Sequence, residues 1–111
     1  MGILNRLRYW RRLKADLTAR SAADIPDRLP ARHGVIVGTD SHPKWLVFDC
    51  PCRRGHRVML NLDPGHAPRW RVSTTTPLTL HPSVDERSPV GHCHYVVRDG
   101  HVRWIERTDH R

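Results

Sequence analysis

The sequence predicts an α+β fold, in which an N-terminal amphipathic helix precedes a small, mostly antiparallel β-sheet stapled by a zinc site. Three observations predict it: apolar residues recur at helical spacing near the N-terminus, short alternating runs follow Pro30, and three cysteines stand close to histidines. A chain of 111 residues with 38% apolar residues builds only a thin core. A bound metal would therefore add much to its stability.

The helix is expected over residues 3–22, with residues 1–23 as a basic helical segment and residues 24–111 as the zinc-binding, β-rich domain. Ile3, Leu7, Trp10 and Leu17 are spaced so that they share one stripe of a helix. Pro26 ends the segment, because proline disfavours helix in the residue before it. The other face is basic, and the residues expected to contact an anionic partner are Arg6, Arg8, Arg11, Arg12 and Lys14. The alternative is a helix packed on the domain with its arginines in water.

Short β-like runs follow the helical segment. Asp99-Gly100 predicts a two-residue hairpin turn, because such a turn needs residues that tolerate a positive φ. Strict alternation of apolar and polar residues is clearest around Val58–Leu62 and Val102–Trp104. The predicted strands are Gly34–Gly38, Lys44–Asp49, Arg57–Leu62, Trp70–Thr75, Leu78–His81, Tyr95–Arg98 and Val102–Glu106.

Charge and cysteine usage limit the classes of partner and compartment. The net charge of +8 and the pI near 10.7 favour an anionic partner, which includes nucleic acid, a membrane surface or an acidic protein face. No run approaches the roughly 20 apolar residues of a membrane span, and no secretory signal is visible. The odd number of cysteines argues against a closed disulfide framework. We therefore expect a cytoplasmic protein with reduced thiols.

Closely spaced cysteines and histidines predict a structural Zn²⁺ site. Cys50-Pro51-Cys52 supplies two thiolates from one turn, and Cys93 supplies a third from a distant segment. The spacing leaves the fourth ligand open among His94, His56 and His92. Neighbouring side chains of a strand point to opposite faces, so Cys93 and His94 can both be ligands only where the backbone is irregular. The alternative is a set of buried, inert cysteines and surface histidines.

Ser83, in the segment His81-Pro82-Ser83-Val84, is a candidate nucleophile. His94 or His81 would serve as its general base, as in serine hydrolases. His94 cannot both ligate zinc and accept a proton from Ser83, so the two hypotheses compete for this side chain. The simpler interpretation is a turn or capping serine after a proline.

Several of these motifs together resemble a small bacterial domain family, found in operons for ubiquitin-like conjugation, whose component there is called BubE. The resemblance covers roughly residues 24–106. It is carried by the segments Trp45–Pro64 (WLVFDCPCRRGHRVMLNLDP), Pro68–Val72 (PRWRV), Leu80–Val84 (LHPSV), Cys93–Tyr95 (CHY) and Arg98–Trp104 (RDGHVRW).

The resemblance implies one metal site made by the C-P-C motif and the later Cys/His pair, with His94 as the preferred fourth ligand. It also implies an accessory protein of a ubiquitin-like modification pathway. That protein would act as a protein-binding module for the ubiquitin-like protein or its conjugation enzymes. The alternative is a peptidase that processes or deconjugates a ubiquitin-like protein with Ser83 and His94. A second alternative, which rests on the charge and not on the resemblance, is a nucleic-acid-binding protein that uses the basic helix. The residues that would stack on bases are Trp10, Trp45, Trp70 and Trp104.

Overall fold

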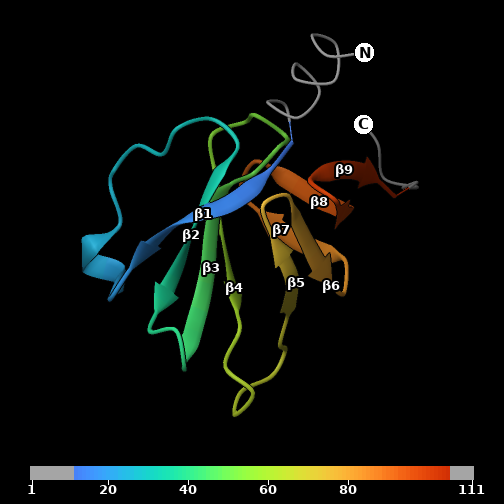
Figure 1. Ribbon diagram of the computed structural model, residues 1–111. Helices are drawn as coiled ribbons and strands as arrows, with labels where there is room; N and C mark the ends of the chain where they lie inside the picture. Colours follow the sequence, from blue (N-terminus) through green and yellow to red (C-terminus); the bar gives the residue numbers. More distant parts are fainter. Residues whose placement is uncertain (1–11, 106–111) are drawn as a thin grey trace, which may run out of the picture.

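The computed structural model describes residues 12–105, and this part of the chain is built from nine β-strands and one short 3-10 helix (Figure 1). The elements, in chain order, are β1 (Lys14–Ala19), η1 (Ala22–Asp24), β2 (His33–Gly38), β3 (Pro43–Asp49), β4 (Arg57–Asn61), β5 (Arg71–Thr75), β6 (Leu78–His81), β7 (Val84–Ser88), β8 (Gly91–Arg98) and β9 (His101–Trp104).

The first four strands form one sheet and lie side by side in chain order. β2, β3 and β4 pair in antiparallel fashion, whereas β1 pairs parallel with β2. The parallel pair is possible because η1 and the loop after it carry the chain back to the same end of the sheet. In the β3–β4 pair, Val47 lies opposite Met59 and Asp49 lies opposite Arg57.

The four-stranded sheet buries apolar side chains on both of its faces. Its inner face carries Leu46, Phe48, Val58 and Leu60, which pack in the main core. Its outer face carries a second, smaller cluster made of Ala19, Leu29, Val35, Val37 and Val47. This outer cluster leaves the β4 side uncovered, since the side chain of Met59 is 45% exposed.

The remaining strands close the other side of the main core. β5 pairs with β6, and β7, β8 and β9 form a three-stranded antiparallel sheet. Along β8 the side chains alternate, with Cys93, Tyr95 and Val97 buried and the residues between them partly exposed. This alternation matters for the site, because it sends Cys93 and His94 to opposite faces of the sheet.

The predicted N-terminal helix, and with it the α+β class, is wrong for the described residues. Residues 14–19 of the segment expected to be helical form strand β1, and the only helical turn between residues 12 and 105 is η1. Leu13, Ala15 and Ala19 are buried while Asp16 and Thr18 are exposed, which is the period of a strand. Small alanines at the buried positions hid this alternation behind the larger residues at helical spacing. Residues 1–11 lie outside the described part.

The prediction of a mostly antiparallel sheet after Pro30 agrees with the structure. Each predicted run corresponds to a strand or to part of one, and the Asp99-Gly100 turn is confirmed with φ angles of 51° and 78°. β7 was not predicted, because Val84 is its only buried apolar residue and charged residues dominate the rest. This strand carries no pattern that separates it from a polar loop.

Candidate metal centre and serine–histidine pair

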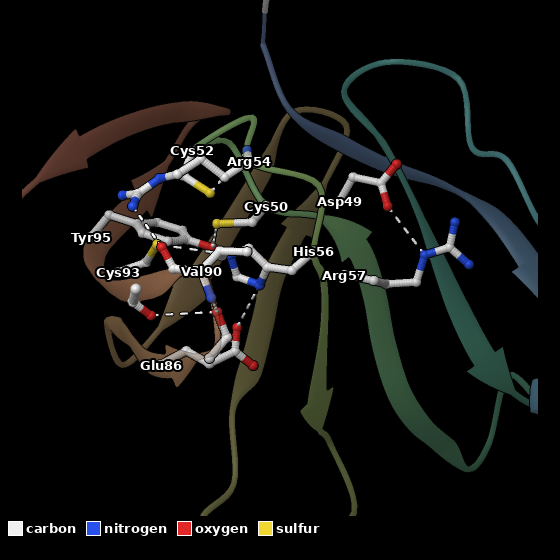
Figure 2. Close-up of polar contacts among 12 residues, drawn as sticks. Asp49, Cys50, Cys52, Arg54, His56, Arg57, Glu86, Val90, Cys93 and Tyr95 are labelled. Carbon is white, nitrogen blue, oxygen red and sulfur yellow. Dashed lines mark hydrogen bonds and ion pairs between the residues drawn. The ribbon is translucent and has the colours of Figure 1, made fainter.

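Three thiols and one imidazole converge between the β3–β4 turn and β8 (Figure 2). The potential ligand atoms of Cys50, Cys52, His56 and Cys93 all lie within 4.8 Å of one another, close enough to bind a metal ion. Ligands about 2.3 Å from a tetrahedral zinc ion stand about 3.8 Å apart, and the distance from Cys93 Sγ to His56 Nε2 is 3.8 Å. All three cysteines are free thiols, as expected from their odd number.

The β3–β4 turn folds tightly enough to bring three of these side chains together. Arg53 N donates to Cys50 O at 3.2 Å, and Cys50 N donates to His56 O at 3.0 Å, which closes the turn at both ends. Arg53 and Gly55 have φ angles of 63° and 90°. Reversal of the chain over so few residues requires these left-handed positions.

Polar groups around the cluster suit sulfur ligands and hold the two segments together. Arg54 N lies 3.4 Å from Cys52 Sγ, and Tyr95 Oη lies 3.8 Å from Cys50 Sγ. The Arg54 guanidinium donates to Val90 O at 2.7 Å and thereby links the turn to the start of β8. Gly91 leaves room for this contact, because a Cβ there would stand 2.8 Å from Arg54 Nη1.

Burial and hydrogen bonding act in opposite directions on the thiols. Burial raises the pKa of Cys50 to about 12 and also raises the pKa of Cys93. Burial opposes ionisation of Cys52 too, but hydrogen bonds, first that from Arg54 N, outweigh it and lower the pKa of this thiol. A metal ion must therefore displace protons from buried thiols when it binds.

The structure separates the three histidines considered for the fourth position. His56 lies with the thiols, His92 is hydrogen-bonded to Asp85, and His94 lies against Ser83. β8 is a regular strand at this point, so His94 points away from the face on which Cys93 meets the other sulfurs. The competition for His94 between zinc and Ser83 does not arise in this geometry.

Ser83 and His94 lie together as a nucleophile and base would. Ser83 Oγ is 3.1 Å from His94 Nε2, within hydrogen-bonding distance. Ser83 lies just before β7, and its carbonyl oxygen accepts a hydrogen bond of 3.2 Å from Trp70 Nε1. His94 is held in β8, where its own carbonyl accepts from Ile105 N at 3.0 Å. His81, the other base considered, is exposed at the end of β6.

A negative charge lies beside the Ser83–His94 pair. Asp85 is the cross-strand partner of His94 and is hydrogen-bonded to His92. That hydrogen bond lowers the pKa of Asp85, and nearby His94 acts in the same direction. The rings of His92 and His94 are stacked with centroids 6.4 Å apart. Asp85, Trp70 and the His92 contact carry no sequence signal of their own, since they depend on pairing between strands.

Comparison with known proteins identifies the family. The sequence model of the BubE family matches residues 21–105, more than half of the chain, and includes both residue clusters. The chain belongs to the BubE family. This family is described as the serine protease of a bacterial ubiquitination-like system, and the resemblance to BubE seen in the sequence motifs is confirmed. Neither the curated proteins nor the solved structures give a match to this BubE chain.

The predicted partner-binding residues are only partly described in this BubE-family structure. Arg6, Arg8 and Arg11 lie outside the described residues, and Lys14 belongs to β1. Of the tryptophans considered for base stacking, Trp70 binds Ser83 O, and Trp104 packs on Tyr95 with ring centroids 4.9 Å apart. Between residues 12 and 105, the chain forms no helix with the length and apolarity that a bilayer crossing needs.

Proposed function

We propose that this protein is a serine peptidase of a bacterial ubiquitin-like modification pathway, with Ser83 as nucleophile and His94 as general base. The observation that carries the proposal is the 3.1 Å separation between Ser83 Oγ and His94 Nε2. Membership of the BubE family, which is described as a serine protease of such a system, supports it. The substrate class that follows is a ubiquitin-like protein joined to another group through its C-terminal carbonyl.

The reaction then proceeds by acyl transfer. Ser83 Oγ attacks the carbonyl carbon of the scissile bond while His94 Nε2 accepts the hydroxyl proton. The protonated His94 gives this proton to the leaving amine, which departs and leaves an ester between the substrate and Ser83. A water molecule then attacks the ester carbonyl carbon while His94 accepts its proton. The bond to Ser83 Oγ breaks, His94 returns the proton to this oxygen, and the substrate leaves as a carboxylic acid that ionises in water. The Asp85 carboxylate, ionised beside the histidines, stabilises the imidazolium that forms.

We further propose that Cys50, Cys52, His56 and Cys93 hold a structural Zn²⁺ ion. Three thiolates and one imidazole fill a tetrahedral shell and leave no position for water, so the metal supports the fold and takes no part in catalysis. Free thiols reserved for a metal suit the reducing cytoplasm, where we expect the protein to act.

Labelling with a fluorophosphonate tests the nucleophile without knowledge of the substrate. We expect the probe to label the wild-type protein at Ser83. Ser83→Ala should abolish the labelling, and His94→Ala should slow it by at least about a thousandfold. Ser73→Ala is the matched control, because Ser73 is exposed on β5, outside the Ser83–His94 pair.

Cleavage of a fusion between a ubiquitin-like protein of a bacterial ubiquitination-like system and a C-terminal tag tests the pathway. Wild-type protein should release the tag, and Ser83→Ala should not. A wild-type protein that neither reacts with the probe nor cleaves the fusion would remove the peptidase proposal. It would favour a non-catalytic, protein-binding role in the same pathway.

A further inference from the structure

A groove of about 520 Å³ lies on the outer face of the four-stranded sheet, between β3, β4 and the loop over residues 63–68. Its apolar wall is formed by Trp45, Met59, Ala67, Pro68 and Trp70. Met59 is 45% exposed, one of two large apolar side chains exposed to this degree between residues 12 and 105. The thioether side chain is flexible and polarisable, which suits contact with differently shaped apolar groups. The groove is therefore a site for an apolar ligand.

The Asn61 side chain helps to hold the loop that forms one wall of the groove. The Asn61 amide donates to the carbonyl oxygens of Asp63, His66 and Pro68, each at 3.1 Å. Its own oxygen accepts from Asp63 N at 3.1 Å. Four hydrogen bonds from one side chain fix the loop over residues 63–68, so a ligand would not need to order it.

Trp70 connects this groove to the nucleophile. Its indole lines the groove and donates from Nε1 to Ser83 O at 3.2 Å. Its main-chain nitrogen donates to Asn61 O at 2.8 Å and so joins the indole to the wall of the groove. Trp70 therefore links the groove to the residue proposed as nucleophile.

The charged groups at the rim of the groove offset one another. Hydrogen bonds, first that from Gly65 N and then that from His66, lower the pKa of Asp63, which keeps this carboxylate charged at the rim. Lys44 lines the same groove and offsets this charge. A ligand with a bulky apolar side chain and little net charge fits these surroundings, and a nucleic-acid backbone does not.

We propose that the groove binds a bulky apolar side chain from the extended C-terminal segment of the ubiquitin-like substrate, next to the bond that Ser83 attacks. The inference rests on the proposed peptidase function and adds a specificity determinant to it. Met59 and Trp70 contact the substrate side chain, and Asn61 acts as a positioning residue through the loop. A substrate that lacks this side chain leaves the apolar wall of the groove unburied and should therefore bind more weakly.

Binding to the Ser83→Ala protein tests the groove separately from catalysis. The probe is a fluorescein-labelled peptide with the C-terminal sequence of a ubiquitin-like protein from a bacterial ubiquitination-like system. Adding Met59→Asp should raise its Kd by at least about tenfold, because a carboxylate would be buried against the apolar side chain. Met59→Leu keeps the apolar wall and should leave the Kd within about threefold. Since Met59 is half-exposed, both variants should unfold at the temperature of their parent.

Replacement of the apolar residues of the peptide by aspartate, one at a time, locates the bound side chain. One replacement should weaken binding to the parent protein, and the same replacement should have little further effect on the Met59→Asp protein. Equal peptide affinity of the parent and Met59→Asp proteins would overturn the groove proposal. So would an oligonucleotide that binds the parent protein more tightly than the peptide does and that binds the Met59→Asp protein more weakly. Absence of fluorophosphonate labelling in the wild-type protein would instead count against the peptidase function, whatever the peptide affinity of the Ser83→Ala protein.

Discussion

Two adjacent residues, Cys93 and His94, divide the chemistry of this molecule between two faces of one sheet. Cys93 is fully buried and meets the sulfurs of the β3–β4 turn, while His94 faces Ser83. Strand alternation forces this division, since successive side chains of β8 point in opposite directions. A metal ion bound by Cys93 would therefore also hold His94, the proposed general base, in position without contacting it.

Glu86 is expected to orient His56 for the metal. Glu86 Oε1 is buried, has no hydrogen-bond partner within residues 12–105, and lies 3.7 Å from His56 Nδ1. The other ring nitrogen, Nε2, faces Cys93 Sγ. A carboxylate beside the ring nitrogen that does not bind the metal fixes the tautomer of a metal-bound histidine. The loss of such a carboxylate commonly weakens metal affinity about 10- to 100-fold.

Glu86→Ala should therefore lower the Zn²⁺ affinity, measured by competition with a chromogenic chelator, by at least about tenfold. Glu86→Gln retains a hydrogen-bond acceptor and should lose less. Asp16→Asn is the control, because Asp16 pairs with His33 and not with a ligand. An unchanged affinity in Glu86→Ala would mean that the carboxylate does not act on His56.

The residue types of the site could be predicted from the sequence, but their grouping could not. C-P-C and Cys93 indicated a metal, and Ser83 with His94 indicated a hydrolase. Which histidine joins the thiols depends on whether β8 is regular at residue 93, and only strand pairing determines that. The contacts of Trp70, Asp85 and Glu86 likewise follow from register, which has no local signature in the sequence.

At the scale of the elements, strand prediction succeeded where large apolar residues alternate and failed where they do not. β1 was taken for a helix because its buried alternate positions are alanines, and its pairing with β2 is a tertiary effect. The hairpin between β8 and β9 was predicted because its turn is coded locally by Asp99-Gly100. The turn can be predicted from its own two residues, whereas the parallel pairing of an edge strand depends on the rest of the fold.

Gly100 is expected to be a sensitive position of this hairpin. Its φ is +78°, and a Cβ there would stand 2.5 Å from Arg12 Cβ and 2.9 Å from Leu13 O. The same residue exchanges main-chain hydrogen bonds with β6 and with the chain before β1. A Gly100→Ala variant must therefore shift backbone as well as accept a strained φ, at an expected cost of about 2–3 kcal/mol.

Gly55→Ala separates the cost of a strained φ from the cost of crowding around the added Cβ. Gly55 has a φ of +90° but nothing within 4 Å of the added Cβ, so only the strain of about 1 kcal/mol should appear. Urea unfolding of both metal-loaded variants gives the two free energies. Equal losses at the two positions would show that crowding at Gly100 contributes nothing.

At the scale of the whole molecule, a metal ion bound by the four potential ligands would link its two halves. The thiol cluster joins the turn of the four-stranded sheet to β8 of the three-stranded sheet, at one end of the main core (Figure 2). Other contacts also cross this boundary: His56 Nδ1 lies 3.7 Å from Glu86 Oε1, and Arg54 donates a hydrogen bond to Val90 O. A small core gains stability from such a link because metal binding is coupled to folding.

Removal of the metal should therefore lower both stability and activity. Chelation should reduce the Tm and slow fluorophosphonate labelling of Ser83, since β8 carries both Cys93 and His94, and added Zn²⁺ should restore both. The stabilisation should also depend on pH. In the metal-free protein burial holds the pKa of Cys50 near 12, so the metal displaces a proton, and its affinity falls as pH falls. The difference in Tm between metal-loaded and metal-free protein should be smaller at pH 6 than at pH 8. A difference that does not change with pH would mean that thiol deprotonation is not coupled to the stabilising metal.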